Sequence, residues 1–141
     1  MDPARQGAAP GAPGRRLGRA QRLTEKRLFD ETYAQGECWR GRFMVFWRRR
    51  GPGAALRLGV VASRKVGGAV QRARCKRRLR EAYRLNRSRF SGDCDIVLIS
   101  RAALLTAPWD ALNNELLRLA AAAGLTPRGG AARTAEGANR T

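Results

Sequence analysis

Residues 64–89 constrain the fold of this chain more than any other stretch. They contain 11 of its 29 Lys and Arg residues and a single acid, Glu81. At about 100° per residue, positions 70–86 separate into an apolar stripe and a basic stripe. The apolar stripe consists of Cys75, Leu79, Ala82 and Tyr83 and continues to the polar Asn86, its fifth member. The basic stripe consists of Arg74, Arg77, Arg80 and Arg84. The pattern predicts an amphipathic helix with one side packed on a sheet.

The basic side of this helix predicts a polyanion as its partner. Side chains at i, i+3 and i+4 lie about 5–6 Å apart, so these guanidinium groups repel one another until phosphates neutralise them. The whole chain carries a net charge of +18 with a pI near 11.7, which favours nucleic acid over a membrane or an acidic protein. The alternative is a solvated basic face on a very basic protein.

Several function classes are excluded by residues that the sequence lacks. It has no His, which rules out Ser-His and Cys-His nucleophile pairs, an imidazole base and a Cys-His zinc site. Cys38, Cys75 and Cys94 are isolated, so neither a metal cluster nor a disulfide framework is expected. No apolar run is long enough for a membrane span or a signal peptide, which predicts a cytoplasmic protein. We predict no catalytic residue and no metal ligand.

At 141 residues the chain is expected to form one domain, over residues 21–124. Residues 1–20 are predicted to be a disordered basic arm and residues 125–141 a disordered tail, because neither has a hydrophobic period. Thr24 is the expected N-cap of a helix that ends near Gly36. Pro108 is expected to open a last helix to about Ala123. Its inner stripe consists of Leu112, Leu116, Leu119 and Ala123.

Three further stretches are expected to be strands. Residues 40–50 are apolar on both faces, with Phe43, Val45 and Trp47 alternating with Met44 and Phe46. The turn at residues 51–53 predicts a hairpin with a second strand over residues 56–62. Residues 95–100 form a continuous apolar run typical of an inner strand.

Aromatic residues predict a second surface. Phe29 and Tyr33 lie at i, i+4 spacing, so their rings can form a ledge on the first helix. The outer face of the strand with Trp47 is either covered by that helix or left as a stacking platform, where each base contributes about 1–3 kcal/mol. The alternative for all these rings is a place in the core.

Residues 57–83 also carry a family signature. They read RLGVVASRKVGGAVQRARCKRRLREAY, which resembles the arginine-rich motif of the protein component of bacterial ribonuclease P. The usual Arg-Asn-Arg core of that motif reads Arg72-Ala73-Arg74 here, so its central amide is absent. The loop before the helix lacks the Gly-Lys-Ser/Thr ending of a nucleotide P-loop, which favours RNA backbone over ATP. The resemblance covers roughly residues 20–123.

The resemblance implies an α/β (α+β) two-layer sandwich with a four-stranded mixed sheet, three helices and a left-handed β-α-β crossover, like the second domain of ribosomal protein S5. It implies the protein subunit of ribonuclease P, which assists a catalytic RNA in removing the 5′ leader from precursor tRNA. The implied partners are that RNA and precursor tRNA, with no membrane and no obligate protein partner. Mg²⁺ is implied as a cofactor held mainly by the RNA and the substrate.

The resemblance also assigns residues to two binding surfaces. The residues expected to bind the RNA subunit are Arg72, Arg74, Lys76, Arg77, Arg80 and Arg84. Those expected to bind the leader are Phe29, Tyr33, Val45, Trp47, Ser63, Arg64 and Lys65. Trp47 is the preferred stacking residue, with structural burial as its alternative.

Three other functions are compatible with parts of the sequence. A ribosomal or general RNA-binding protein shares the charge and the aromatic residues. A protein-only nuclease needs paired carboxylates, for which Asp93 and Asp95 are the close candidates. A DNA-binding helix-turn-helix protein is disfavoured because no second helix lies a short turn from the basic one.

Overall fold

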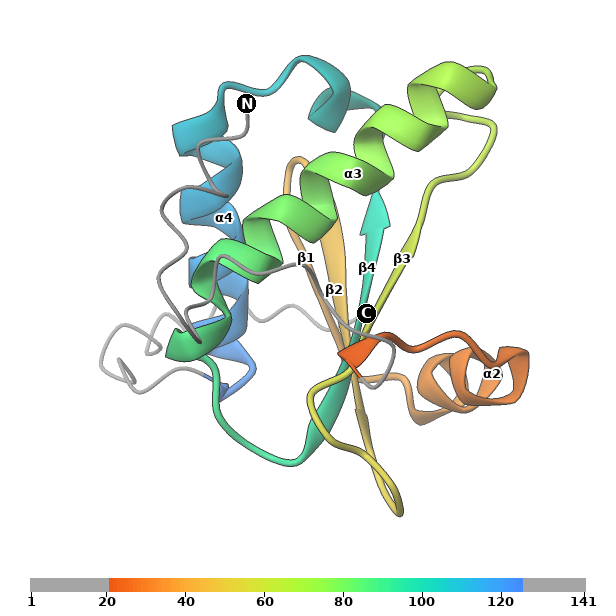
Figure 1. Ribbon diagram of the computed structural model, residues 1–141, viewed down its shortest axis with the longest axis vertical. Helices are drawn as coiled ribbons and strands as arrows, with labels where there is room; N and C mark the ends of the chain where they lie inside the picture. Colours follow the sequence, from red (N-terminus) through yellow and green to blue (C-terminus); the bar gives the residue numbers. More distant parts are fainter. Residues whose placement is uncertain (1–20, 126–141) are drawn as a thin grey trace.

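The computed structural model describes residues 21–125 (Figure 1). The arm predicted over residues 1–20 and the tail from residue 126 onward lie outside the described residues. The α-helices are α2 (Lys26–Gln35), α3 (Ala69–Asn86) and α4 (Trp109–Ala122). The strands are β1 (Cys38–Arg40), β2 (Met44–Arg50), β3 (Leu58–Val61) and β4 (Cys94–Ser100). Short 3₁₀ helices include η2 (Arg87–Arg89) and η3 (Ala102–Thr106).

The strands form one mixed sheet in the order β1-β2-β4-β3. β2 pairs antiparallel with β1 and with β4, whereas β3 pairs parallel with β4. The hairpin predicted at residues 51–53 is therefore wrong, because β4 lies between β2 and β3. The Gly-Pro-Gly turn does reverse the chain. β3 nevertheless does not pair with β2, because the parallel β3-α3-β4 unit places β4, the later and more apolar strand, between them.

Helices α3 and α4 cover one face of the sheet and enclose the main core (Figure 1). On α3 the predicted apolar stripe is confirmed, since all five of its members are buried. On α4 the inner stripe is also confirmed, and Gly124 ends the helix with a left-handed φ of 80°. Leu125 is 2% exposed and packs in the same core, so ordered packing reaches one residue past position 124.

Helix α2 covers part of the opposite face of the sheet and forms a second, smaller core of Leu23, Leu28 and Val97. The two faces of β2 are both apolar, as predicted: Met44 and Phe46 face the main core, while Trp47 packs against the α2 core. Phe43 differs from the prediction. It precedes the strand, where the alternation does not yet hold, and it joins the main core.

Two element boundaries also differ from the sequence-based expectation. The N-cap of α2 is Glu25 in place of Thr24, without a side-chain capping bond, whereas the end at Gly36 is confirmed by its φ of 68°. The strand β1 was not predicted, because three residues at a sheet edge carry too short a pattern. It adds Cys38 and Trp39 to the buried residues.

Candidate nucleic-acid interface

The outward side of α3 carries exposed cations without acidic partners. Arg74, Arg77 and Arg80 are exposed, and none has a carboxylate within 4.0 Å among residues 21–125. Desolvation lowers the pKa of Arg80, and the positive charges of Arg22 and Arg77 lower it further. This part of α3 therefore has an uncompensated positive potential, which a polyanion relieves.

Arg22 belongs to this cluster although the sequence analysis did not include it. The segment before α2 runs beside β3, where Arg22 forms a parallel bridge with Leu58 and the Leu23 N–H donates to the Leu58 carbonyl at 2.9 Å. Arg22 is exposed there, and its charge acts on Arg80. No local pattern predicts this placement, because it depends on pairing with a strand 36 positions later (58 − 22).

Three other cations of α3 differ in their exposure. Arg72 is half-buried and donates to the Gly67 carbonyl at 3.1 Å, so it also anchors the turn before the helix. Lys76 is half-buried. Arg84 does not join the exposed face: its side chain is 9% exposed and pairs with Glu81, the one acid of the helix. The helical period predicts on which side of the α3 axis Arg84 lies. It does not predict that the side chain is buried or that it pairs with Glu81 one turn earlier.

The turn over residues 63–65 presents charge at the end of β3. Ser63, Arg64 and Lys65 are all exposed. The Ser63 hydroxyl accepts from the Lys65 N–H at 3.2 Å, and the Ser63 carbonyl accepts from the Val66 N–H at 3.0 Å. These bonds fix the backbone of the turn and leave its two cationic side chains free to reach an anion.

On the α2 side, Tyr33 and Trp47 lie edge to face, with ring centroids 5.1 Å apart and an interplanar angle of 77°. Tyr33 is the more accessible ring, at 36% exposed, and Trp47 is half-buried beside it. The indole Nε1 of Trp47 is buried without a hydrogen-bond partner. Phe29 packs over Gly59, where a Cβ atom would come within 2.5 Å of its ring. Tyr33 therefore presents the ring, and Trp47 supports it.

The sheet provides an apolar row next to these rings. Trp47, Val97 and Gly59 are neighbours across β2, β4 and β3, and helix α2 covers this row. The next row consists of Val45, Ile99 and Val61, and all three are only half-buried. Val45 was expected at this surface from the sequence, whereas Val61 and Ile99 were not, because their alignment depends on strand pairing that a single sequence does not show.

The buried carboxylates have structural partners. Asp95 accepts from Arg49 at 2.7 Å, from Arg57 at 2.8 Å and from the Ala55 N–H at 3.1 Å. Burial raises the pKa of this carboxyl, but the hydrogen bonds from Arg57 and the Ala55 N–H outweigh burial and hold it below its ordinary value. Asp93 is exposed. The pair proposed for a protein-only nuclease is thus divided between a buried ion-pair network and the surface.

The other buried carboxylate, Glu115 of α4, accepts from the backbone N–H groups of Arg42, Phe43 and Met44 at 2.8–3.1 Å. Within the described part of the chain, no group of three or more Cys, Asp or Glu side chains is placed to hold a metal ion. The same part contains no helix long and apolar enough to cross a membrane. What it does contain is a basic helix face and a separate apolar row with an aromatic rim, both suited to RNA.

Comparison with known proteins identifies the family. The model of the family described as "Ribonuclease P" matches residues 17–124. The chain belongs to the bacterial ribonuclease P protein family. The ribonuclease P protein component of Symbiobacterium thermophilum is 40% identical over 113 residues, which cover 79% of this chain and 98% of that protein. That of Lachnoclostridium phytofermentans is 31% identical over 101 residues, covering 72% and 87%.

Solved structures of ribonuclease P proteins share the fold. That of Staphylococcus aureus gives a TM-score of 0.66 at 25% identity and covers 75% of this chain and 97% of its own. That of Thermotoga maritima gives 0.63 at 30% identity, covering 70% and 94%. The predicted α+β fold is confirmed, and the chain is the protein subunit of the ribonuclease P ribonucleoprotein, involved in 5′ processing of precursor tRNA.

Proposed function

We propose that this ribonuclease P protein binds two RNA molecules at once, through surfaces on opposite sides of its sheet. The observation that carries the proposal is the separation of the two surfaces. The outer side of α3 carries cations without acidic partners among residues 21–125, and the α2 side carries the half-buried row of Val45, Ile99 and Val61. The turn over residues 63–65 ends β3 beside that row and leads into α3. It therefore joins the two surfaces.

The α3 surface is the proposed docking site for the catalytic RNA. Its exposed members are Arg74, Arg77 and Arg80, with Arg22 beside them and the half-buried Arg72 and Lys76 at the margin. Each neutralised phosphate releases condensed counterions, so affinity decreases as salt rises. Arg84 is left out of this surface because it is buried against Glu81.

The α2 surface is the proposed site for the single-stranded 5′ leader. Bases stack on Tyr33 and pack on the apolar row, while Arg64 and Lys65 contact phosphates. Trp47 and Phe29 hold this site in shape from below. Stacking and phosphate contacts read no base edges, so leaders of many sequences bind.

The proposed role of the protein is positional, and the RNA carries the chemistry. Asp95 and Glu115 use their acceptor oxygens on arginine and backbone donors. We therefore assign the Mg²⁺ ions to the RNA subunit and the substrate, where metal-bound water can hydrolyse one phosphodiester bond. We place this work in the cytoplasm, with precursor tRNA as substrate and without an obligate protein partner.

Reconstitution tests the function directly. The protein is added to a bacterial catalytic RNA at low Mg²⁺, and the 5′ end of the tRNA product is mapped. We expect cleavage at the mature 5′ end that requires both components. Cleavage by the protein without RNA contradicts the proposed role, as does an absence of stimulation at every Mg²⁺ concentration at which the RNA alone is inactive.

Leader binding is tested by Tyr33→Ala and Trp47→Ala. Tyr33→Ala removes the ring on which a base stacks, and Trp47→Ala removes the ring that supports Tyr33. Because a stacked base contributes about 1–3 kcal/mol, each variant is expected to bind long-leader substrate about tenfold more weakly and leaderless substrate normally. Tyr33→Phe, which keeps the ring, is the matched control. Equal losses with both substrates would make these rings structural and would favour a general RNA-binding protein.

A further inference from the structure

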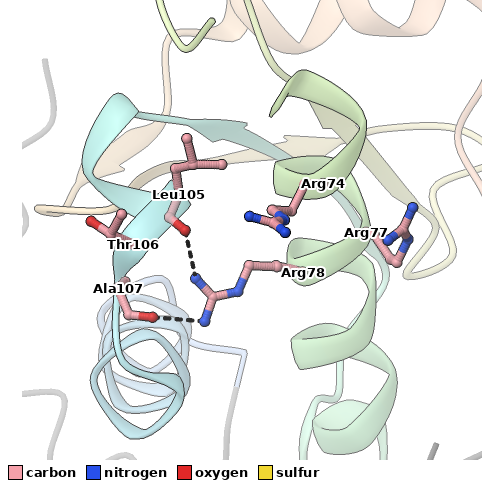
Figure 2. A pocket seen from close by; sticks show the side chains of 6 residues that line it. All are labelled: Arg74, Arg77, Arg78, Leu105, Thr106 and Ala107. Atoms are coloured by element: carbon pink, nitrogen blue, oxygen red, sulfur yellow. Dashed lines mark hydrogen bonds between the residues drawn. The ribbon is translucent and has the colours of Figure 1, made fainter. Parts of the chain in front are cut away.

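A pocket of about 450 Å³ lies between α3 and η3 (Figure 2). One wall is the basic helix and the other is the turn that follows β4. The residues that line it are Arg74, Arg77, Arg78, Leu105, Thr106 and Ala107. The family signature does not explain this pocket, because half of its lining comes from η3 and the residue after it.

Arg78 holds the two walls together. Its Nη1 donates to the Leu104 carbonyl at 2.7 Å, and its Nη2 donates to the Ala107 carbonyl at 2.7 Å. The planar guanidinium fork thereby clamps both ends of one turn to α3. The acceptors are neutral, and no carboxylate within the described residues pairs with Arg78. Its positive charge therefore remains uncancelled in the wall of the pocket.

Arg74 adds a second charge at the i−4 position. Figure 2 shows its guanidinium on the η3 side of the helix, beside that of Arg78, whereas Arg77 projects from the other side. Arg74 is exposed and has no acidic partner in residues 21–125. Two guanidinium groups one turn apart repel each other. An anion bound between α3 and η3 attracts both groups and thereby offsets their repulsion.

We propose that this pocket binds one backbone phosphate of the catalytic RNA, with Arg74 as the contacting residue and Arg78 as a positioning residue. A phosphate fits the chemistry because guanidinium N–H groups bind its oxygens in a paired geometry. The Thr106 hydroxyl at the rim is a further donor. The inference rests on the proposed function and adds to it a defined subsite built from two elements.

The location of the pocket favours the catalytic RNA over precursor tRNA as the source of this phosphate. The pocket opens beside α3, on the side of the sheet covered by α3 and α4, while the apolar row lies on the α2 side. A cleft between two elements also fixes where a phosphate sits. Together with the contacts of Arg77 and Arg80, this fixed point defines the register of the protein on the RNA.

A double-mutant cycle tests the role of Arg78. Affinity for the catalytic RNA is measured for Arg74→Ala, Arg78→Leu and the pair, with folding checked by circular dichroism. Each single change is expected to weaken binding about tenfold. The double change is expected to weaken it by little more than either single change, because loss of the Arg78 clamp releases η3 and already removes the subsite of Arg74. Arg74→Ala with Arg80→Ala is the control, expected to be additive at about a hundredfold. Full additivity for Arg74 and Arg78 overturns the proposal.

Crosslinking from η3 provides a second test that does not depend on the clamp. The native residues Cys38, Cys75 and Cys94 are buried, so Thr106→Cys is the accessible thiol for a photoactivated crosslinker. Crosslinks to the catalytic RNA, well above those from the exposed control Arg40→Cys, are expected. Crosslinks to precursor tRNA alone, or none above the control, contradict the proposal.

The two levels of inference fail in different ways. If the unmodified protein stimulates cleavage by the catalytic RNA but Thr106→Cys does not crosslink to it, only the pocket assignment is lost. If the unmodified protein gives no stimulation, the proposed function is lost as well.

Discussion

The arginines of β2 and those of α3 differ in their neighbours. Arg48 and Arg50 both pair with Glu37, at 2.7 Å and 2.9 Å, and Arg49 pairs with Asp95 and Glu31. On α3, by contrast, Arg74, Arg77 and Arg80 have no carboxylate partner within the described residues. Both groups are basic runs in the sequence.

The two groups differ in their carboxylate partners and not in the run of charge, and on this difference we assign a structural role to the arginines of β2 and propose a binding role for those of α3. Arg49 is 2% exposed and connects α2, β4 and the turn at Pro52 through its three nitrogen atoms. Its charge is already used inside the protein. Arg74, Arg77 and Arg80 on α3 have no such partner among residues 21–125, so substitutions in the two groups are expected to have different consequences.

The largest expected effect is on stability, from Asp95→Asn. The change removes the charge that Arg49 and Arg57 share and places amide hydrogens against their guanidinium groups. Breaking a buried ion pair from one side costs about 3–5 kcal/mol of unfolding free energy, measurable by urea denaturation. The exposed neighbour Asp93 is the control, and Asp93→Asn is expected to stay within about 0.5 kcal/mol of the parent. Equal losses for both variants contradict the structural role.

The next effect is on RNA affinity, from Arg77→Ala combined with Arg80→Ala. Loss of two phosphate contacts is expected to weaken binding of the catalytic RNA about a hundredfold and to reduce the slope of log affinity against log salt by about two. The unfolding free energy should not decrease, because neither side chain has a carboxylate partner to lose within residues 21–125. A fall in stability with unchanged salt slope would place these arginines in the structural group.

A smaller effect is expected from acid. Asp95 and Glu37 both have a pKa below its ordinary value: burial opposes the shift, and arginine hydrogen bonds outweigh burial. Their stabilisation is present above the unfolded-state pKa, about 4, and is lost as pH falls through the folded-state pKa. Unfolding free energy measured from pH 6 to pH 2 should therefore decrease more steeply for the parent than for Asp95→Asn. Parallel curves would exclude Asp95 as the titrating group.

The smallest effect is expected from Arg50→Ala. Arg50 is 61% exposed on its side chain and pairs with Glu37 at the surface, where an ion pair contributes about 0–1 kcal/mol. The unfolding free energy measured in urea should fall by no more than about 1 kcal/mol, and affinity for the catalytic RNA should change by no more than about threefold. If Arg50→Ala loses as much affinity for the catalytic RNA as an α3 variant does, the RNA-binding surface extends onto β2. The distinction between the arginines of β2 and those of α3 would then not hold.

The parts of the fold predicted from sequence are those in which one segment carries the whole pattern. Helix α3 begins and ends within one residue of the expected 70–86, because its apolar stripe follows the helical period. Strand pairing was not predictable in the same way. The turn at residues 51–53 indicates a reversal, but only the competition among strands for the sheet centre places β4 beside β2.

The candidate site shows the same division. The exposed positions of Arg74, Arg77 and Arg80 follow from helix geometry. The burial of Arg84 does not, and neither does the alignment of Ile99 with Val45. Arg22 and Arg78 were missed because their roles depend on residues that are distant in the sequence.

Relocating charge tests most directly whether the arrangement on α3 matters. Arg77→Ala and Arg80→Ala are combined with Asn114→Arg and Ser91→Arg, two exposed sites outside α3, so the net charge stays at +18. Stimulation of precursor cleavage by the catalytic RNA is then measured at low Mg²⁺. If cations must be held in place on α3, the relocated variant stays as defective as the double Ala variant. Full recovery of the cleavage rate would show that positive charge anywhere on the surface is sufficient.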